Sequence, residues 1–247
     1  MRWALLVLSM LPLAAQQGPN LYSRQKEIAL GAELARQVER TSTPLNNPDA
    51  LKYIRQMGAR LTSQLADAPF PYTFHLIASV NGSPIEEPMA LPGGHIFIPS
   101  NLFLAARDES ELAGLVAHAM AHIADRDGTR MATPSQPSEA GAIPLVFLGR
   151  LPGYGTQGTS VAIPAAMIRL SNEYELEADS LAVRMAAGAG YDAQGLLTFL
   201  TRDRPKNYVT GSNNLDSRIT ALRDALQAPP LSSNDEFLRL QEQLRQH

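Results

Sequence analysis

The sequence predicts a mainly helical α+β fold in a single domain. Most of the chain carries apolar residues at the three- and four-residue spacing of amphipathic helices. One stretch, residues 73–78, alternates in the manner of a strand, and a second extended stretch runs over residues 89–99. No internal repeat or long linker divides the 247 residues, which are enough for one substantial core. We therefore expect one helical domain with a small sheet.

The expected elements have recognisable boundaries. Asp108, with Glu111 three residues later, resembles a capping box and predicts the start of a helix. Residues 131–160 are rich in Pro, Gly, Ser and Thr, which predicts a loop. In chain order, we expect helices at 23–40 and 48–65, a strand after residue 71, the extended stretch at 89–99, and helices at 109–125, 165–187, 193–202, 215–226 and 233–246.

The composition excludes several partners and chemistries. Lys and Arg total 21 and Asp and Glu total 24, which gives a formal net charge of -3 without any basic cluster. This balance argues against nucleic acid and against an anionic membrane surface as partners. Because Cys is absent, disulfides, thiolate metal sites and a Cys nucleophile are excluded. Any metal site must therefore use His, Asp and Glu.

The first fifteen residues are typical of an export signal. Arg2 supplies a positive charge, residues 4–13 are largely apolar, and small residues at 14 and 15 suit cleavage. The apolar run is too short to cross a bilayer, so no transmembrane span is expected. The sequence thus predicts a signal peptide at 1–15 and a mature chain at 16–247 in a periplasmic or secreted location, with a buried N-terminal helix as the alternative.

Two histidines four residues apart, His118 and His122, lie within the helix predicted after Asp108. Residues with this spacing share one helix face, so both imidazoles can point at one metal ion. An isolated pair of this kind is more often two buried histidines bonded to backbone. The metal-binding interpretation therefore needs a third ligand from elsewhere in the chain.

The predicted helix at 165–187 supplies acidic candidates. At about 100° per residue, Glu175 and Asp179 share one face, whereas Glu173 and Glu177 lie on the opposite side and are expected to be solvated. We expect Glu175 to complete a two-His, one-carboxylate zinc site. Asp179 would hold a ligand imidazole through its second N–H. Three protein ligands leave a fourth position for water, as catalytic zinc requires.

Four segments occur in the order found in one known family: residues 91–97, residues 111–114, the pair His118 and His122, and the pair Glu175 and Asp179. On these segments the chain is identified as a member of metallopeptidase family 48. These gluzincins include the CAAX prenyl endopeptidase, HtpX and BepA-type periplasmic proteases. The resemblance covers about residues 21–226. It implies a zincin-like domain with Zn²⁺ bound by the two histidines and Glu175.

The resemblance also implies how a substrate would bind. It places an edge strand near residues 95–98, beside the HxxxH helix, against which an extended peptide could pair. Gly94, His95 and Ile96 are then the expected substrate-binding residues. Unfolded or extended polypeptide segments are the implied partners.

The sequence departs from this family where the chemistry takes place. In the HExxH motif, the Glu after the first His is the general base that takes a proton from zinc-bound water, and here that position is Ala119. Family members commonly carry a His six residues before an Arg that matches Arg218, and here that position is Ser212. Our leading hypothesis is a zinc-binding protein with weakened or lost proteolysis and a chaperone-like, peptide-binding role in envelope protein quality control.

Two alternatives remain open from the sequence. The first is an active zinc metalloendopeptidase in which Glu173, Asp125 or Glu177 replaces the missing base. The second is a metal-free interaction domain in which the two histidines are merely buried. Arg218 either pairs with a carboxylate near the cleft or stabilises the last helix of the domain.

Overall fold

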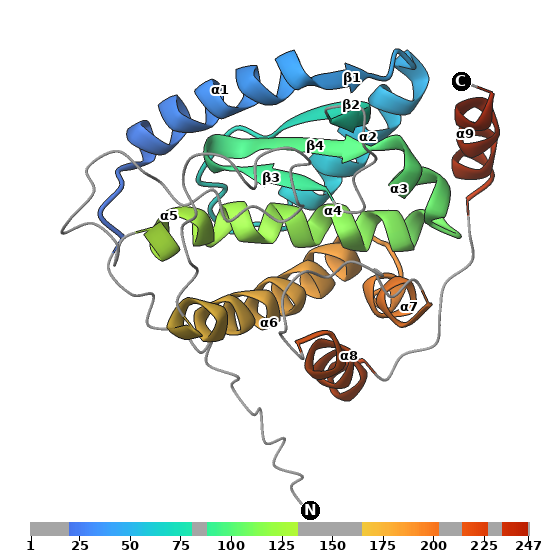
Figure 1. Cartoon of the computed structure of the whole chain (residues 1–247). Helices are drawn as coiled ribbons and strands as arrows, with labels where there is room; N and C mark the ends of the chain where they lie inside the picture. Colours follow the sequence, from blue (N-terminus) through green and yellow to red (C-terminus); the bar gives the residue numbers. More distant parts are fainter. Residues whose placement is uncertain (1–19, 81–87, 133–164, 203–213, 227–233, 247) are drawn as a thin grey trace, which may run out of the picture.

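The computed structural model describes residues 20–80, 88–132, 165–202, 214–226 and 234–246 (Figure 1). The expected signal peptide at 1–15, most of the expected loop at 131–160, and Ser212 lie outside these ranges. Within them, no helix is both long enough and apolar enough to cross a bilayer.

The described part of the chain is mainly helical with one four-stranded sheet, so the predicted single-domain α+β fold is confirmed. In chain order, the elements are α1 (Arg24–Thr41), β1 (Ser42–Pro44), α2 (Pro48–Thr62), β2 (Thr73–Val80), β3 (Met89–Leu91), the 3-10 helix η1 (Pro92–Gly94), β4 (His95–Pro99), α3 (Ser100–Ala105), α4 (Glu109–Ala124), α5 (Asp127–Ala132), α6 (Ala165–Gly188), α7 (Gly195–Arg202), α8 (Asn214–Ala225) and α9 (Asp235–Arg245). The expected helices begin and end within a few residues of their predicted positions, whereas α3 and α5 were not expected.

The strand order in the sheet is β1-β2-β4-β3, with β2 and β4 parallel and the other neighbours antiparallel. The predicted edge strand beside the HxxxH helix exists, but it is β3 and not the strand at His95 and Ile96. β4 is bonded on both sides, so the expectation that a peptide pairs with it is wrong. The physical reason is the turn at η1, where Gly93 and Gly94 have φ values of 78° and 107° and reverse the chain, so that β3 pairs outside β4.

Both faces of the sheet are covered. On one face, Leu34, Ala35 and Val38 of α1 pack against sheet residues that include Ile77 and Phe97. On the other face, α2 and α4 enclose the larger core. Figure 1 shows α1 and α4 on opposite sides of the strands. The sheet is therefore a buried layer that fixes the position of α4.

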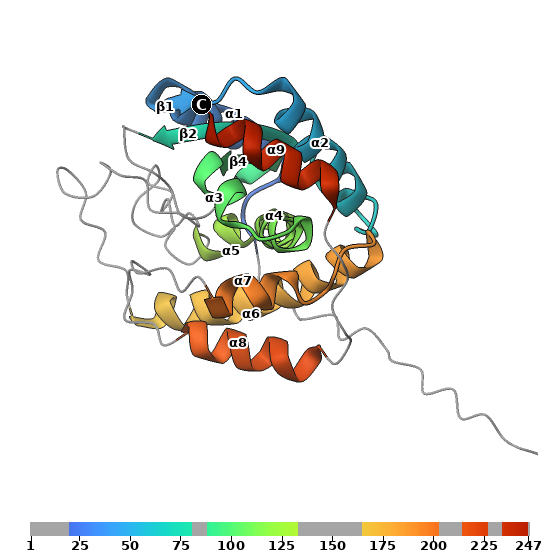
Figure 2. The same ribbon diagram turned by 90° about the vertical axis from the view of Figure 1, so that its right-hand side faces the viewer.

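Helix α4 is the centre of the molecule, and its residues from Ser110 to Ile123 are all buried. Its N-cap is Asp108, whose side chain accepts from the backbone N–H groups of Ser110 and Glu111. The Glu111 side chain accepts from the backbone N–H of Arg107 at 2.8 Å and also pairs with Arg202 of α7. Figure 2 shows α6, α7 and α8 on the side of α4 away from the sheet.

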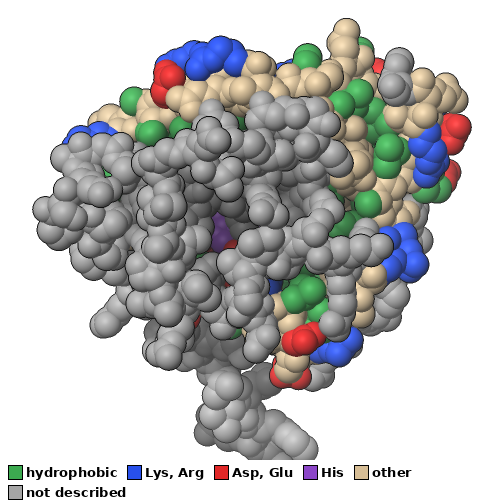
Figure 3. Space-filling model, in the orientation of Figure 1, with side chains coloured by type: hydrophobic (Ala, Val, Ile, Leu, Met, Phe, Trp, Pro, Cys, Tyr) green, Lys and Arg blue, Asp and Glu red, His purple; other side chains and the backbone are tan. Residues whose placement is uncertain are grey.

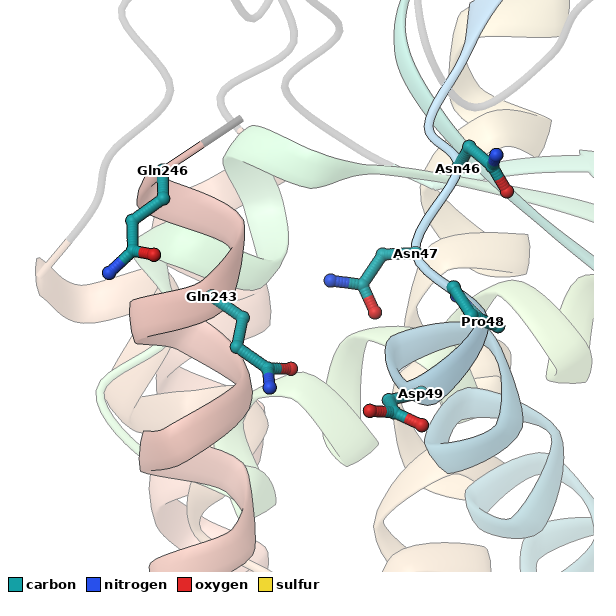
Figure 4. A pocket seen from close by; sticks show the side chains of 6 residues that line it. All are labelled: Asn46, Asn47, Pro48, Asp49, Gln243 and Gln246. Carbon is teal, nitrogen blue, oxygen red and sulfur yellow. The ribbon is translucent and has the colours of Figure 1, made fainter.

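Helix α9 packs on the domain. Phe237 stacks on Phe103 of α3 with ring centroids 5.2 Å apart, and the Gln241 amide donates to the backbone carbonyl oxygens of Phe103 and Ala106 at 2.9 and 2.6 Å. Between α9 and the start of α2 lies a polar pocket (Figure 4), lined by Asn46, Asn47, Pro48, Asp49, Gln243 and Gln246.

Candidate metal centre

The structure brings together His118 and His122 of α4 and Glu175 of α6. One ligand atom of each residue lies within 4.8 Å of the others. The two Nε2 atoms are 3.1 Å apart, and the Glu175 carboxylate oxygens lie 3.4 Å from His118 Nε2 and 3.7 Å from His122 Nε2. Histidine and acidic atoms are visible near the middle of the face in Figure 3. Among the described residues, these three form the group of His, Asp and Glu side chains that could share an ion.

Helices α4 and α6 pack against each other, and both carry buried alanines near the ligands in sequence. Ala117 and Ala121 of α4 and Ala178 and Ala182 of α6 have no exposed surface. Small side chains at a contact let helix axes approach closely. The imidazoles and the carboxylate then span a short gap, with exposed fractions of 7%, 8% and 9% for His118, His122 and Glu175. The three residues are therefore almost completely buried.

Each imidazole has a carboxylate on its other nitrogen. His118 Nδ1 lies 2.9 Å from Asp179 Oδ1, the partner that the sequence predicted. His122 Nδ1 lies 2.7 Å from Asp127 Oδ2, a contact that the sequence reasoning missed. A carboxylate at Nδ1 holds a proton there and leaves the lone pair on Nε2. When both rings are neutral, as metal binding requires, their Nε2 lone pairs therefore face the centre of the group.

The arrangement fits a zinc ion. Two facing lone pairs 3.1 Å apart repel each other unless a cation or a proton lies between them. Tetrahedral zinc with Zn–N distances of about 2.0–2.1 Å separates two nitrogen ligands by about 3.3 Å. Two imidazoles and one carboxylate are a donor set that catalytic zinc sites use. The donor set and the spacing of His118 and His122 thus agree with the metal that the sequence predicted.

Arg218 of α8 neutralises the acidic side of the group. Its side chain is 1% exposed, and its Nε and Nη2 donate to the two oxygens of Asp179 at 2.7 Å each. Its Nη1 lies 2.9 Å from Glu175 Oε2. Burial raises the pKa of both carboxyl groups, but the Arg218 charge and the adjacent histidines outweigh this effect and hold both pKa values below their usual range. Glu175 and Asp179 are therefore ionised.

The position of the missing base is apolar. Ala119 is 1% exposed and belongs to the main hydrophobic core. Of the expected substitutes, Glu173 is exposed and Glu177 lies 3.6 Å from the Arg130 guanidinium. Asp125 caps the end of α4, and burial with the charges of Asp127 and Glu177 raises its pKa to about 6.

Comparison with known proteins gives a consistent set of relatives. Residues 48–226 match the family described as Peptidase family M48. The chain is 28% identical to the beta-barrel assembly-enhancing protease of Escherichia coli K12, over 92% of this chain and 50% of that protein. It is also 28% identical to the putative beta-barrel assembly-enhancing protease of Vibrio cholerae, over 83% and 45% of the two chains. The chain thus spans about half the length of these relatives.

Proposed function

Because the chain belongs to peptidase family M48, we propose that it is a zinc-binding member of this family whose proteolysis is weakened or lost. The observation that carries the proposal is the convergence of His118, His122 and Glu175 next to the apolar position of Ala119. These three side chains would hold the ion. Zinc supplies a Lewis acid and lowers the pKa of bound water to about 7.

The remaining chemistry depends on groups that this chain lacks. A methyl group at Ala119 cannot accept the proton of an attacking water, and loss of a general base costs about 10²–10⁴ in rate. Ser212 in place of a histidine removes a cationic donor, and loss of one oxyanion-stabilising group costs about 10²–10³. These factors do not simply multiply, because both groups act on one step. Efficient hydrolysis by the usual route is therefore not expected.

We place the proposed polypeptide-binding surface at the edge of the sheet formed by β3. Within the described residues, no strand pairs with the outer side of β3, which packs against α4. An extended polypeptide can add to such an edge through backbone hydrogen bonds. The relatives are named as proteases that enhance beta-barrel assembly, so unfolded, strand-forming polypeptides are the substrate class that we propose. With the predicted export signal, this favours a chaperone-like role in the periplasm or outside the cell.

Metal analysis and a protease assay test the proposal. Purified protein is expected to hold about one zinc per chain, and His118→Ala to lose it. His75→Ala is the control, because this histidine lies on β2 and stacks on Phe97. Casein turnover is expected to be about 10²-fold or more below that of an active relative.

Each half of the proposal can fail separately. Absence of zinc, with a melting temperature that a chelator leaves unchanged, would favour the metal-free interaction domain. Casein turnover equal to that of an active relative would refute the loss of proteolysis.

Zinc affinity is expected to depend on pH through His118. Burial and the Arg218 charge lower the pKa of this imidazole, but contacts with Asp179 and Glu175 outweigh them and raise the pKa to about 9. Zinc binds the neutral imidazole and must displace this proton, so its apparent affinity should fall about tenfold per pH unit below that pKa. Competition with a chelator between about pH 6.5 and 8 measures this slope. A constant zinc dissociation constant over this range would contradict the prediction.

A working endopeptidase that uses Asp125 as its base is the second candidate. The raised pKa of this carboxyl group, about 6, lies in the range that a general base at neutral pH requires. This second candidate predicts that the natural chain hydrolyses casein at a substantial rate. It also predicts that Asp125→Asn abolishes this hydrolysis.

A further inference from the structure

We infer that Glu27, in the first turn of α1, is a positioning residue for the metal centre. It holds the turn at Arg126, and this turn places Asp127 against His122. The inference rests on the proposed zinc site and identifies a part of the chain, far from the ligands in sequence, on which zinc affinity depends.

Glu27 is a buried carboxylate that accepts hydrogen bonds from side chains at the junction between α4 and α5. It is 1% exposed, and its Oε1 accepts from Arg126 Nε at 2.8 Å, from Arg126 Nη2, and from Thr129 Oγ1 at 2.7 Å. The Arg126 guanidinium also donates to the backbone carbonyl of Tyr22. The Asn20 amide donates to Thr129 Oγ1 at 2.8 Å. Residues at the start of α1 and in the segment before it thus hold the junction between α4 and α5 in place.

Arg126 needs such an anchor because of its backbone conformation. Its φ is 60°, and among the described residues it is the one non-glycine in the left-handed region. Side chains with a Cβ disfavour this region, so the conformation persists only where surrounding contacts fix it. The ion pair with Glu27 and the bond to the Tyr22 carbonyl supply these contacts.

The left-handed turn is what brings Asp127 to the metal ligand. On a continuous helix, the fifth residue after His122 would point about 140° away from it. The turn at Arg126 interrupts α4 and starts α5, so Asp127 Oδ2 reaches His122 Nδ1 at 2.7 Å. Arg130 holds the other oxygen of Asp127 at 3.1 Å. Arg130 therefore orients the carboxylate, whereas Glu27 fixes the backbone that carries it.

Zinc dissociation constants of matched variants test this role. Glu27→Gln keeps the size of the side chain but removes its charge, and it is expected to weaken zinc binding about tenfold, the lower end of the effect of losing a ligand's outer partner. Asp127→Asn is expected to weaken it about 10–100-fold. Glu33→Gln is the control, because Glu33 lies on the same helix in an exposed pair with Arg36, and its zinc affinity should equal that of the natural chain.

A second readout separates positioning from general stability. A merely structural Glu27 would lower the melting temperatures of the zinc-free and zinc-loaded proteins equally. A positioning Glu27 makes the zinc-induced rise in melting temperature smaller in Glu27→Gln than in Glu33→Gln, because the stabilisation by zinc grows with the logarithm of its affinity.

Variants of Arg126 keep the inference testable if Glu27→Gln fails to fold. Arg126→Ala removes the anchor but keeps a Cβ in the left-handed turn, whereas Arg126→Gly removes both the anchor and the strain. We expect about tenfold weaker zinc binding for the alanine variant and a smaller loss for the glycine variant. Natural affinity in Glu27→Gln, or in Arg126→Ala, would overturn the inference while leaving the proposed zinc site intact. Absence of zinc from the natural chain would overturn both.

Discussion

Replacing Ala119 with glutamate is expected to increase casein hydrolysis by about 10²-fold or more, because it restores a proton acceptor next to the first histidine ligand. The ligand group of His118, His122 and Glu175 is already assembled, so the variant adds only the base. Ala119 is 1% exposed, and a longer side chain must therefore displace part of the core. Turnover should be measured per zinc-loaded molecule to correct for any loss of folded protein.

Ala119→Gln is the matched control for this experiment. It has the size of glutamate but cannot act as a base at neutral pH, so its turnover should stay at the level of the natural chain. Adding Ser212→His to the Ala119→Glu variant is expected to increase the rate further, by up to about 10²–10³-fold. If Ala119→Glu changes nothing while Asp125→Asn abolishes hydrolysis, the chain is an active endopeptidase with Asp125 as its base.

Replacing Arg218 with methionine is expected to reduce the free energy of unfolding of the zinc-free protein by about 3–5 kcal/mol. Methionine retains most of the length of the side chain but no charge. The substitution leaves the carboxylates of Asp179 and Glu175 buried without the cation that now lies 2.7 and 2.9 Å from them. Urea denaturation in the presence of a chelator measures the loss, and added zinc should reduce it by returning positive charge to the group.

An exposed arginine provides the comparison. Arg24 pairs with Asp67 at 2.8 Å, but the two side chains are 53% and 73% exposed. Ion pairs of this kind contribute little to stability, so Arg24→Met should leave the urea midpoint unchanged. A similarly small effect of Arg218→Met would show that the buried carboxylates find other compensation.

Local patterns were sufficient for the long helices but not for the short helices α3 and α5 or for the order of the strands. The apolar spacing of residues 48–65 and 165–187 depends on one helix at a time, and α2 and α6 lie where it predicts. The place of β4 depends on its parallel pairing with β2, in which Phe74 lies opposite Ile96. Such pairing between distant segments leaves no periodic signal in either strand, and the edge was therefore assigned to the wrong one.

The same distinction applies to the candidate site. The sequence predicted the three converging side chains, because each helix face could be derived from its own spacing. Asp127 was missed because, on a straight helix, a residue five positions after His122 points away from it. The left-handed conformation of Arg126 changes the chain direction and brings Asp127 against His122. Glu27 was missed because its contact with Arg126 joins residues 99 positions apart. A polar residue just beyond the HxxxH helix is the signal that could have indicated Asp127.

Under the proposed function, the shortness of β3 limits how firmly a client polypeptide can be held. Its three residues, Met89–Leu91, offer only a few backbone groups to an added strand, and each such bond contributes about 0.5–1.5 kcal/mol net. Met89, Ala90 and Leu91 are buried as whole residues, so strand addition requires that their backbone first becomes accessible. Under the proposed function, a captured segment is released quickly and can be recaptured, and an unfinished strand is shielded without being trapped.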